Sequence, residues 1–155
     1  MAVIDILELP AAAPSRTPLL GLDLGENTIG VAASDASRMI ASPLALIRRT
    51  KFTKDVAELF KLMGGRGVEA LVIGLPVNMD GSEGPRCQSV RAFARHLLML
   101  RDIPIAFWDE RLSTAAVQRM MVTEQDLTRA RRAELVDKTA AAYILQGALD
   151  RLNAD

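Results

Sequence analysis

The sequence of 155 residues has one cysteine, one histidine and no excess of either charge. Cys87 alone can form no internal disulfide and cannot supply a zinc-binding cysteine cluster, so a reducing, cytoplasmic setting is expected. His96, expected on an exposed helix face, leaves no Ser/His/Asp arrangement for nucleophilic catalysis. The nineteen basic and nineteen acidic side chains cancel, so no global field indicates a nucleic-acid partner.

Long hydrophobic runs are also missing, because none approaches the roughly 18 residues of a membrane span. Asp5 and Glu8 lie where a signal peptide would have lysine or arginine. We therefore expect residues 1–18 to form a flexible N-terminal tail rather than an export signal, with no membrane association. Residues 19–155 are expected to form one domain, large enough to bury a core of its own.

Residues 19–35, LLGLDLGENTIGVAASD, are the stretch around which we expect the chain to fold. Two apolar runs flank a turn of glycine and polar residues, which predicts a hairpin whose first strand is buried on both faces. A third run, residues 39–47, completes an antiparallel meander. Pro43 within that run predicts an edge position or a bulge, because proline cannot donate a ladder hydrogen bond.

Helices and strands alternate after the meander. The expected elements are a helix from an N-cap at Thr53 to Gly64-Gly65, a strand at 70–74, a loop at 75–84, a helix from about Pro85, a strand at 104–108, a short helix at 114–122, a flexible loop or poorly formed helix at 123–132, and a long helix at about 133–152. Such alternation implies parallel strands with right-handed crossovers. We predict an α/β fold with a mixed five-stranded sheet, an antiparallel meander followed by parallel strands, and helices on both faces.

Three carboxylates lie where burial is costly. Asp23 interrupts a buried strand, Glu110 follows the last strand, and Asp137 shares a helix face with small and apolar residues. Each has an ordinary alternative: a hairpin-end turn, an ion pair within Asp109-Glu110-Arg111, or an early-helix acid favoured by the helix dipole. Sites in such sheets form beyond the carboxyl ends of the parallel strands, and the strands of Asp23 and Glu110 could be neighbours. We therefore predict a single cluster of the three acids.

A carboxylate cluster of this kind predicts a metal site. Clustered carboxylates raise one another's pKa values unless a cation neutralises them. Oxygen ligands suit Mg²⁺ or Mn²⁺. Two such ions about 4 Å apart can activate a water molecule and stabilise the leaving oxygen in phosphodiester hydrolysis.

Arginine supplies fifteen of the nineteen basic residues, and the basic residues are clustered. The clusters are Arg48, Arg49, Lys51 and Lys54; Arg86, Arg91 and Arg95 with His96; and Arg129, Arg131 and Arg132. Arginine suits phosphate recognition because its planar fork can donate two parallel hydrogen bonds. Any single cluster can equally be a solvated helix face.

Four ordered motifs carry a family resemblance: GLDLGENTIGVAASD, VIGLPVNMDGSEG, FWDERLST and LVDKTAAAYILQGALD. Over about residues 19–152 the chain resembles the YqgF family, also called RuvX, of Holliday-junction-resolvase-like nucleases with an RNase H-like fold. The resemblance implies two divalent ions and catalytic, metal-binding acids at Asp23, Glu110 and Asp137, with Asp109 as a further candidate ligand.

The resemblance also implies, in bacteria, a role in maturing the 5′ end of 16S ribosomal RNA. The candidate nucleic-acid-binding residues are Asn78, Arg86, Arg111, Arg129, Arg131 and Arg132. The expected protein is a cytoplasmic, Mg²⁺- or Mn²⁺-dependent endonuclease for structured RNA, either a monomer or a homodimer. Two alternatives stay open: resolution of branched DNA, which favours a symmetric dimer, and nucleic-acid binding without cleavage.

Overall fold

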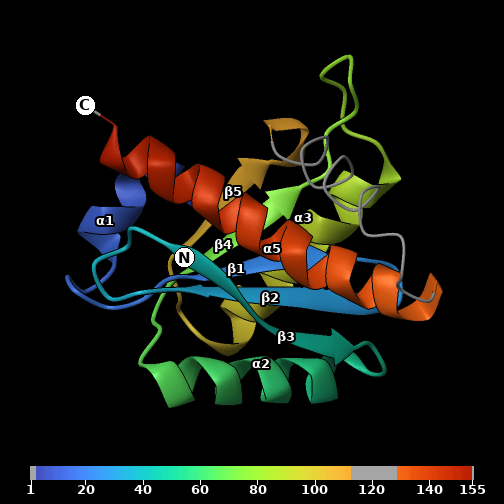
Figure 1. Ribbon diagram of the computed structural model, residues 1–155, viewed down its shortest axis with the longest axis horizontal. Helices are drawn as coiled ribbons and strands as arrows, with labels where there is room; N and C mark the ends of the chain where they lie inside the picture. The colour runs from blue at the N-terminus through green and yellow to red at the C-terminus, as the bar shows by residue number, and fades with distance from the viewer. Residues whose placement is uncertain (1–2, 113–128, 155) are drawn as a thin grey trace.

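The computed structural model describes residues 3–112 and 129–154, with the side chains of residues 3–111 and 139–154. Its elements are η1 (Ile6–Glu8), α1 (Leu9–Ala12), β1 (Leu20–Leu24), β2 (Thr28–Ser34), β3 (Ala41–Arg48), α2 (Phe52–Arg66), β4 (Leu71–Leu75), α3 (Pro85–Leu100), β5 (Ile105–Asp109), η2 (Glu110–Leu112) and α5 (Arg129–Asn153) (Figure 1). One sheet has the strand order β3-β2-β1-β4-β5. β1, β2 and β3 pair antiparallel, whereas β4 pairs parallel to both β1 and β5. The predicted mixed five-stranded sheet is confirmed.

β3 is an edge strand with an irregularity at its proline. Val31 pairs with Ala45, but the next residue, Ala32, pairs with Pro43, so Leu44 is the extra residue of a bulge. Both expectations for Pro43 are thus confirmed, because an edge strand and a bulge each tolerate a residue without a backbone N–H.

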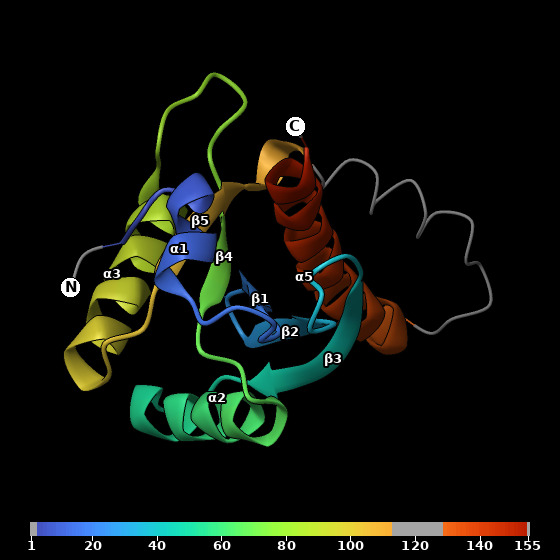
Figure 2. The same ribbon diagram turned by 90° about the vertical axis from the view of Figure 1, so that its left-hand side faces the viewer.

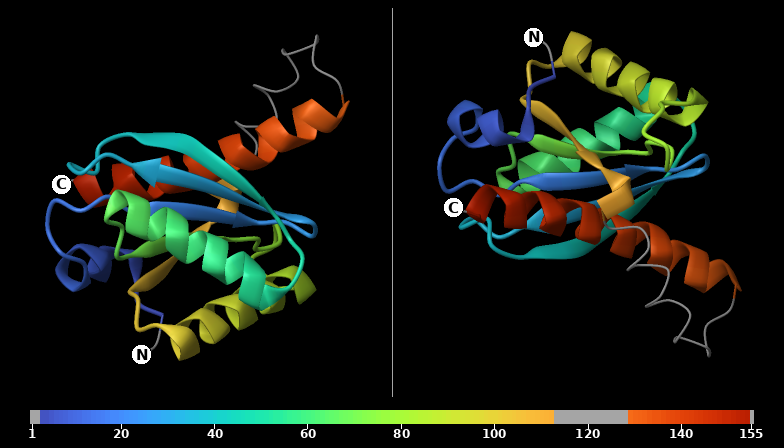
Figure 3. Two further views of the ribbon diagram at one scale, coloured as in Figure 1. Left: turned by 90° about the horizontal axis from the view of Figure 1, so that it is seen from below. Right: turned by 90° about the horizontal axis from the view of Figure 1, so that it is seen from above.

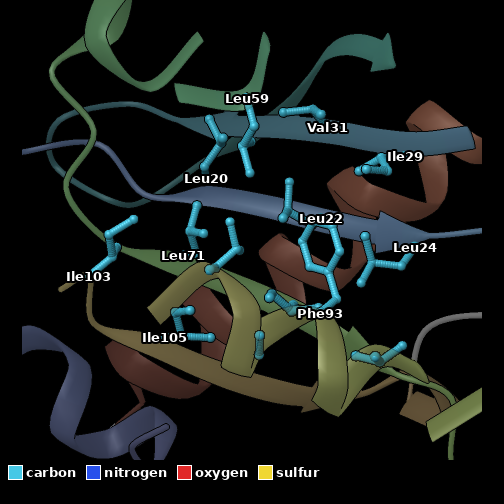
Figure 4. Close-up of a cluster of buried hydrophobic side chains, with 14 of the residues drawn as sticks. Leu20, Leu22, Leu24, Ile29, Val31, Leu59, Leu71, Phe93, Ile103 and Ile105 are labelled. Atoms are coloured by element: carbon cyan, nitrogen blue, oxygen red, sulfur yellow. The ribbon is translucent and has the colours of Figure 1, made fainter. Parts of the chain in front are cut away.

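Helices cover the two faces of the sheet unequally. Figure 2 shows α5 on one face and α2 and α3 on the other. Leu20 and Leu22 of β1 pack on the α2 and α3 side, where Leu59 and Phe93 join them in a buried cluster (Figure 4). Each fully buried leucine of this kind contributes about 1.5–3 kcal/mol to folding. Successive β1 residues alternate between faces, so Asp23 lies on the α5 side.

The bounds of two helices differ from the prediction. α2 begins at Phe52, because the buried carboxylate of Asp55 accepts hydrogen bonds from the backbone N (3.1 Å) and Oγ1 (3.4 Å) of Thr50 and fixes the chain before the first turn. It ends at Arg66 and not at Gly64-Gly65, because the C-cap Gly67, with a φ of +67°, adopts the left-handed conformation. Residues 129–132 belong to α5 and not to a loop. The predicted helix at 114–122 lies outside the described residues.

Residues 4–13, which lie in the stretch expected to be a flexible tail, pack onto the fold. The backbone N of Ile4 donates to the oxygen of Ile105 at 2.9 Å, and Ile4 forms a parallel bridge with Ala106. Leu9 is fully buried. Burial of Leu9 and pairing along β5 explain the order, and the segment covers an otherwise exposed sheet edge.

A search for membrane spans among the described helices finds none with the length and apolar character that crossing a bilayer needs. The helices run alongside the sheet (Figure 3).

Candidate active site

Asp23 and Glu110 lie at the carboxyl end of the sheet, defined here as the end where the parallel strands β1, β4 and β5 finish. Asp23 is half-buried and pairs with Gly30 across the hairpin. Glu110 follows β5 directly and opens η2. The sequence allows β1 and β5 to be neighbours, but in the structure β4 lies between them.

Gly74 of β4 bridges this gap. The β1–β4 pairing ends at Leu22 and Ile73, and Asp23 and Gly74 are the residues that follow them in the two parallel strands. A Cβ added to Gly74 would lie 3.0 Å from both Cγ and Oε1 of Glu110. The carboxylate of Glu110 therefore reaches back over β4 toward the strand that carries Asp23. Sequence reasoning missed Gly74, although a glycine inside a wholly apolar buried strand signals a close approach.

Small residues let α5 lie close to the sheet. A Cβ on Gly21 would lie 2.7 Å from Leu145 Cβ and 3.1 Å from the oxygen of Ala141. A Cβ on Gly147 would lie 2.8 Å from Nε1 of Trp108. That indole nitrogen is buried and has no hydrogen-bond partner among the described residues.

The direction of α5 places Asp137 relative to this site. Near the helix C-terminus, Asn153 Nδ2 donates to the oxygen of Arg38 at 2.9 Å, in the loop between β2 and β3. Ala141 lies over Gly21, and Asp137 precedes Ala141 by one helical turn. Asp137 is therefore on the part of α5 that leads toward the carboxyl end of the sheet. Its side chain lies outside the described residues.

Asp109 is paired with Arg111. Arg111 Nη2 lies 2.6 Å from Asp109 Oδ2, and its Nε and backbone N also donate to this carboxylate. The hydrogen bond from Arg111 is the main cause that holds the pKa of Asp109 below its ordinary value. The ordinary ion-pair interpretation of the Asp-Glu-Arg motif thus applies to Asp109 and Arg111, while Glu110 points over Gly74.

The same arginine supports the loop between β4 and α3, which projects beyond the sheet in Figure 2. Nη1 of Arg111 donates to the oxygens of Asn78 (3.4 Å) and Met79 (3.5 Å). Asn78 N donates to Ser82 O at 2.9 Å and Asn78 Nδ2 to Ser82 Oγ at 3.0 Å, so the loop is a fixed turn. Arg111 is therefore partly engaged within the protein.

The other predicted nucleic-acid-binding residues divide into two groups. Asn78 and Arg86 are exposed, at the projecting loop and the first turn of α3. The side chains of Arg129, Arg131 and Arg132 lie outside the described residues. His96 is exposed on α3, as expected, with its ring 5.6 Å from that of Phe52.

The described donors suit a hard divalent cation. Asp23 and Glu110 offer carboxylate oxygens at one end of the sheet, and the missing side chain of Gly74 leaves Glu110 space that a Cβ would fill. The described side chains contain no group of three metal-binding residues. The third predicted acid, Asp137, lies outside that set.

The chain as a whole matches a known family. The model of a family described as "RuvX: Holliday junction resolvase" matches residues 17–151. The chain belongs to the RuvX family. A Phenylobacterium zucineum (strain HLK1) protein named "Putative pre-16S rRNA nuclease" is 72% identical over 153 residues, 98% of both chains. A Caulobacter vibrioides (strain NA1000 / CB15N) protein of the same name is 61% identical over 153 residues, also 98% of both.

Solved structures confirm the RNase H-like fold of the RuvX chain. T. thermophilus RuvC in complex with a Holliday junction substrate superposes with a TM-score of 0.52 at 15% identity, covering 88% of this chain and 96% of that one. The fowlpox virus Holliday junction resolvase has the same TM-score at 10% identity, with 88% and 100% covered. Family membership and the names of the relatives confirm the predicted nuclease class.

Proposed function

We propose that this RuvX-family protein is a divalent-metal-dependent endonuclease that acts on structured RNA and processes the 5′ end of pre-16S ribosomal RNA. The observation that carries the proposal is the placement of the Glu110 carboxylate over Gly74, toward the strand that holds Asp23. Carboxylates at one end of a sheet repel one another, and a bound cation offsets that repulsion.

Asp23, Glu110 and Asp137 would hold two Mg²⁺ or Mn²⁺ ions. Bound ions of this type activate water and stabilise the leaving oxygen of a phosphodiester. Asp109 would become a further ligand only by exchanging a hydrogen bond of Arg111, so its first role is to orient that arginine. Arg111 in turn holds the projecting loop beside the acids.

Phosphate contacts are assigned to six basic and amide residues: Asn78, Arg86, Arg111, Arg129, Arg131 and Arg132. Asn78 is exposed on the loop that Arg111 holds, and Arg86 is exposed in the first turn of α3, so both can donate to phosphate oxygens. Such contacts position the substrate but carry no sequence information. We also propose a cytoplasmic location, with the protein acting as a monomer or homodimer.

The names of the relatives support ribosomal RNA as the substrate. Branched DNA is the second candidate, because the family is described as a Holliday junction resolvase and the structurally similar RuvC was solved with a Holliday junction substrate. A four-way junction has two-fold symmetry, so that substrate would favour a symmetric dimer.

The test is a panel of labelled substrates with the purified protein. Precursor 16S RNA, four-way DNA and plain RNA and DNA duplexes are incubated in parallel with Mg²⁺, Mn²⁺ or EDTA. The proposal predicts metal-dependent cuts in the precursor RNA and weak or no cutting of the plain duplexes. Preferred cutting of the four-way DNA would make branched DNA the substrate in place of ribosomal RNA. Binding without any cutting would show that the protein is a nucleic-acid-binding module and not a nuclease.

A further inference from the structure

A cavity of about 580 Å³ opens at the same end of the sheet as Asp23 but on the opposite face. Its walls come from the turn between β1 and β2, the chain that joins β3 to α2, and the first turns of α3. The wall residues used below are Leu24, Gly25, Glu26, Arg49, Thr50 and Arg86.

Asp23 and Leu24 connect the cavity to the candidate active site. They are consecutive in β1 and therefore point to opposite faces of the sheet. Asp23 faces α5, whereas Leu24 belongs to the core cluster on the α2 and α3 side (Figure 4). The turn that contains Gly25 therefore separates the face that carries Asp23 from the cavity.

Arg49 is held in place within the wall. Its backbone N donates to Asn27 O at 2.8 Å and its Nη1 to Gly25 O at 2.7 Å. Its guanidinium carbon lies 5.8 Å from the ring centroid of Phe93. The cation is therefore oriented before any ligand binds, which lowers the entropy that binding must offset.

Arg86 supplies a second charge from across the cavity. Its side chain is exposed and makes no hydrogen bond or ion pair with the described side chains or backbone. Glu26 adds one acid to the wall, so two arginines outweigh it. The balance favours an anion, and the arginine forks suit the oxygens of a phosphodiester.

We propose that this cavity binds backbone phosphates of the substrate strand next to the cut, with Arg49 and Arg86 as the contacting residues. The inference rests on the proposed nuclease function and extends the substrate path from the acids around the end of the sheet. Because the contacts are to phosphate, the site positions the strand without reading its sequence.

The test compares Arg86→Gln with Arg86→Lys, and with Arg66→Gln as a matched control. Arg66 is an exposed arginine in the last turn of α2, about 21 Å along that helix from its first residue, Phe52. Binding of labelled precursor RNA is measured against salt, each substitution being placed in an Asp23→Asn background so that the RNA stays intact. Arg86 is chosen over Arg49 because its side chain makes no hydrogen bond or ion pair with the described residues, whereas Arg49 donates to Gly25.

Loss of one phosphate contact should lower the slope of log K against log salt by about 0.9 on duplex and about 0.7 on single strands for Arg86→Gln. Affinity should fall several-fold at low salt, whereas Arg86→Lys and Arg66→Gln should keep the original slope. An Arg86→Gln slope equal to that of the Asp23→Asn parent, or an equal drop in Arg66→Gln, would overturn the inference.

A second readout separates this inference from the proposed function. Cleavage is measured with Asp23 intact, for the wild type and for Arg86→Gln. Wild-type cleavage together with an unchanged Arg86→Gln slope overturns the cavity site and leaves the nuclease proposal standing. No wild-type cleavage together with a reduced slope overturns the nuclease proposal and keeps the phosphate site.

Discussion

The side chain of Glu110 lies against Gly74. Gly74 is in β4, the strand between β1, which carries Asp23, and β5, which Glu110 follows. The added Cβ at Gly74 would lie 3.0 Å from Glu110 Oε1, closer than nearly all real Cβ contacts. The position of the carboxylate therefore depends on the absence of one methyl group.

Replacing Gly74 by alanine should strongly reduce the cleavage rate while the protein stays folded. The methyl group would displace Glu110 and would also meet Ile144 Cδ1 at 2.5 Å, although that flexible end can turn away. Overpacking of this kind costs about 1–3 kcal/mol of unfolding free energy. Cleavage rate and urea unfolding are measured for both Gly74→Ala and the control Gly64→Ala.

The control has the opposite expectation. Nothing lies within 4 Å of a Cβ at Gly64 on α2, so alanine should stabilise that helix by about 0.5–1 kcal/mol and leave cleavage unchanged. Equal activity of Gly74→Ala and wild type would show that the carboxylate does not depend on this space.

Much of the fold could be predicted because local chemistry determines it. The apolar runs around Asp23, the proline in β3 and the polar loop before Pro85 each indicate their element without distant information. The order of strands could not be read in this way, so the separation of β1 from β5 by β4 was missed. The role of Gly74 follows only from that order.

Tertiary contacts also explain the remaining differences. Leu9 is in a short apolar run, and such a run alone does not indicate which surface it packs against. The structure buries Leu9 fully. Gly64-Gly65 was expected to end α2, yet the left-handed residue is Gly67. Both glycines before it lie in open space, where the helix tolerates them.

Gly21→Ala should destabilise the protein through α5. The new methyl group would lie 2.7 Å from Leu145 Cβ, an atom next to the helix backbone, so the helix itself must move. We expect a loss of about 1–3 kcal/mol. Equilibrium unfolding is compared with that of Gly65→Ala, whose Cβ meets nothing within 4 Å. Equal stability of the two variants would contradict the close packing of α5.

Asp35 should make stability depend on pH in acid. Hydrogen bonds from the Ser37 hydroxyl and the backbone N–H groups of Ile40 and Met39 lower its pKa from 3.8 to about 2. A depressed folded-state pKa stabilises the fold above the unfolded value, and this contribution is lost as pH falls from about 4 toward 2. Over that pH range the melting temperature should fall less steeply for Asp35→Asn than for the wild type. Parallel plots of melting temperature against pH would refute the lowered pKa of Asp35.

Metal should stabilise the wild type more than variants of the acids. Asp23→Asn or Asp137→Asn should raise the melting temperature in EDTA at neutral pH, because each removes one repelling charge. An ion at 100 times its dissociation constant stabilises by about 2.7 kcal/mol, and each kcal/mol shifts a domain of this size by about 2–4 °C. Thermal melts with EDTA and with Mn²⁺ measure both effects. If Mn²⁺ leaves the wild-type melting temperature unchanged and both variants melt below the wild type in EDTA, the acids have a structural role and do not bind metal.

Cleavage of precursor 16S RNA by Asp23→Asn and Glu110→Gln, beside the wild type, is the most direct test of the metal-dependent site. Binding is measured in parallel, with every protein purified free of contaminating nuclease. The account predicts that the wild type cuts with Mg²⁺ or Mn²⁺ and not with EDTA, and that both variants lose cleavage while binding stays within a few-fold. Full cleavage by either variant, or cleavage by the wild type in EDTA, would contradict it.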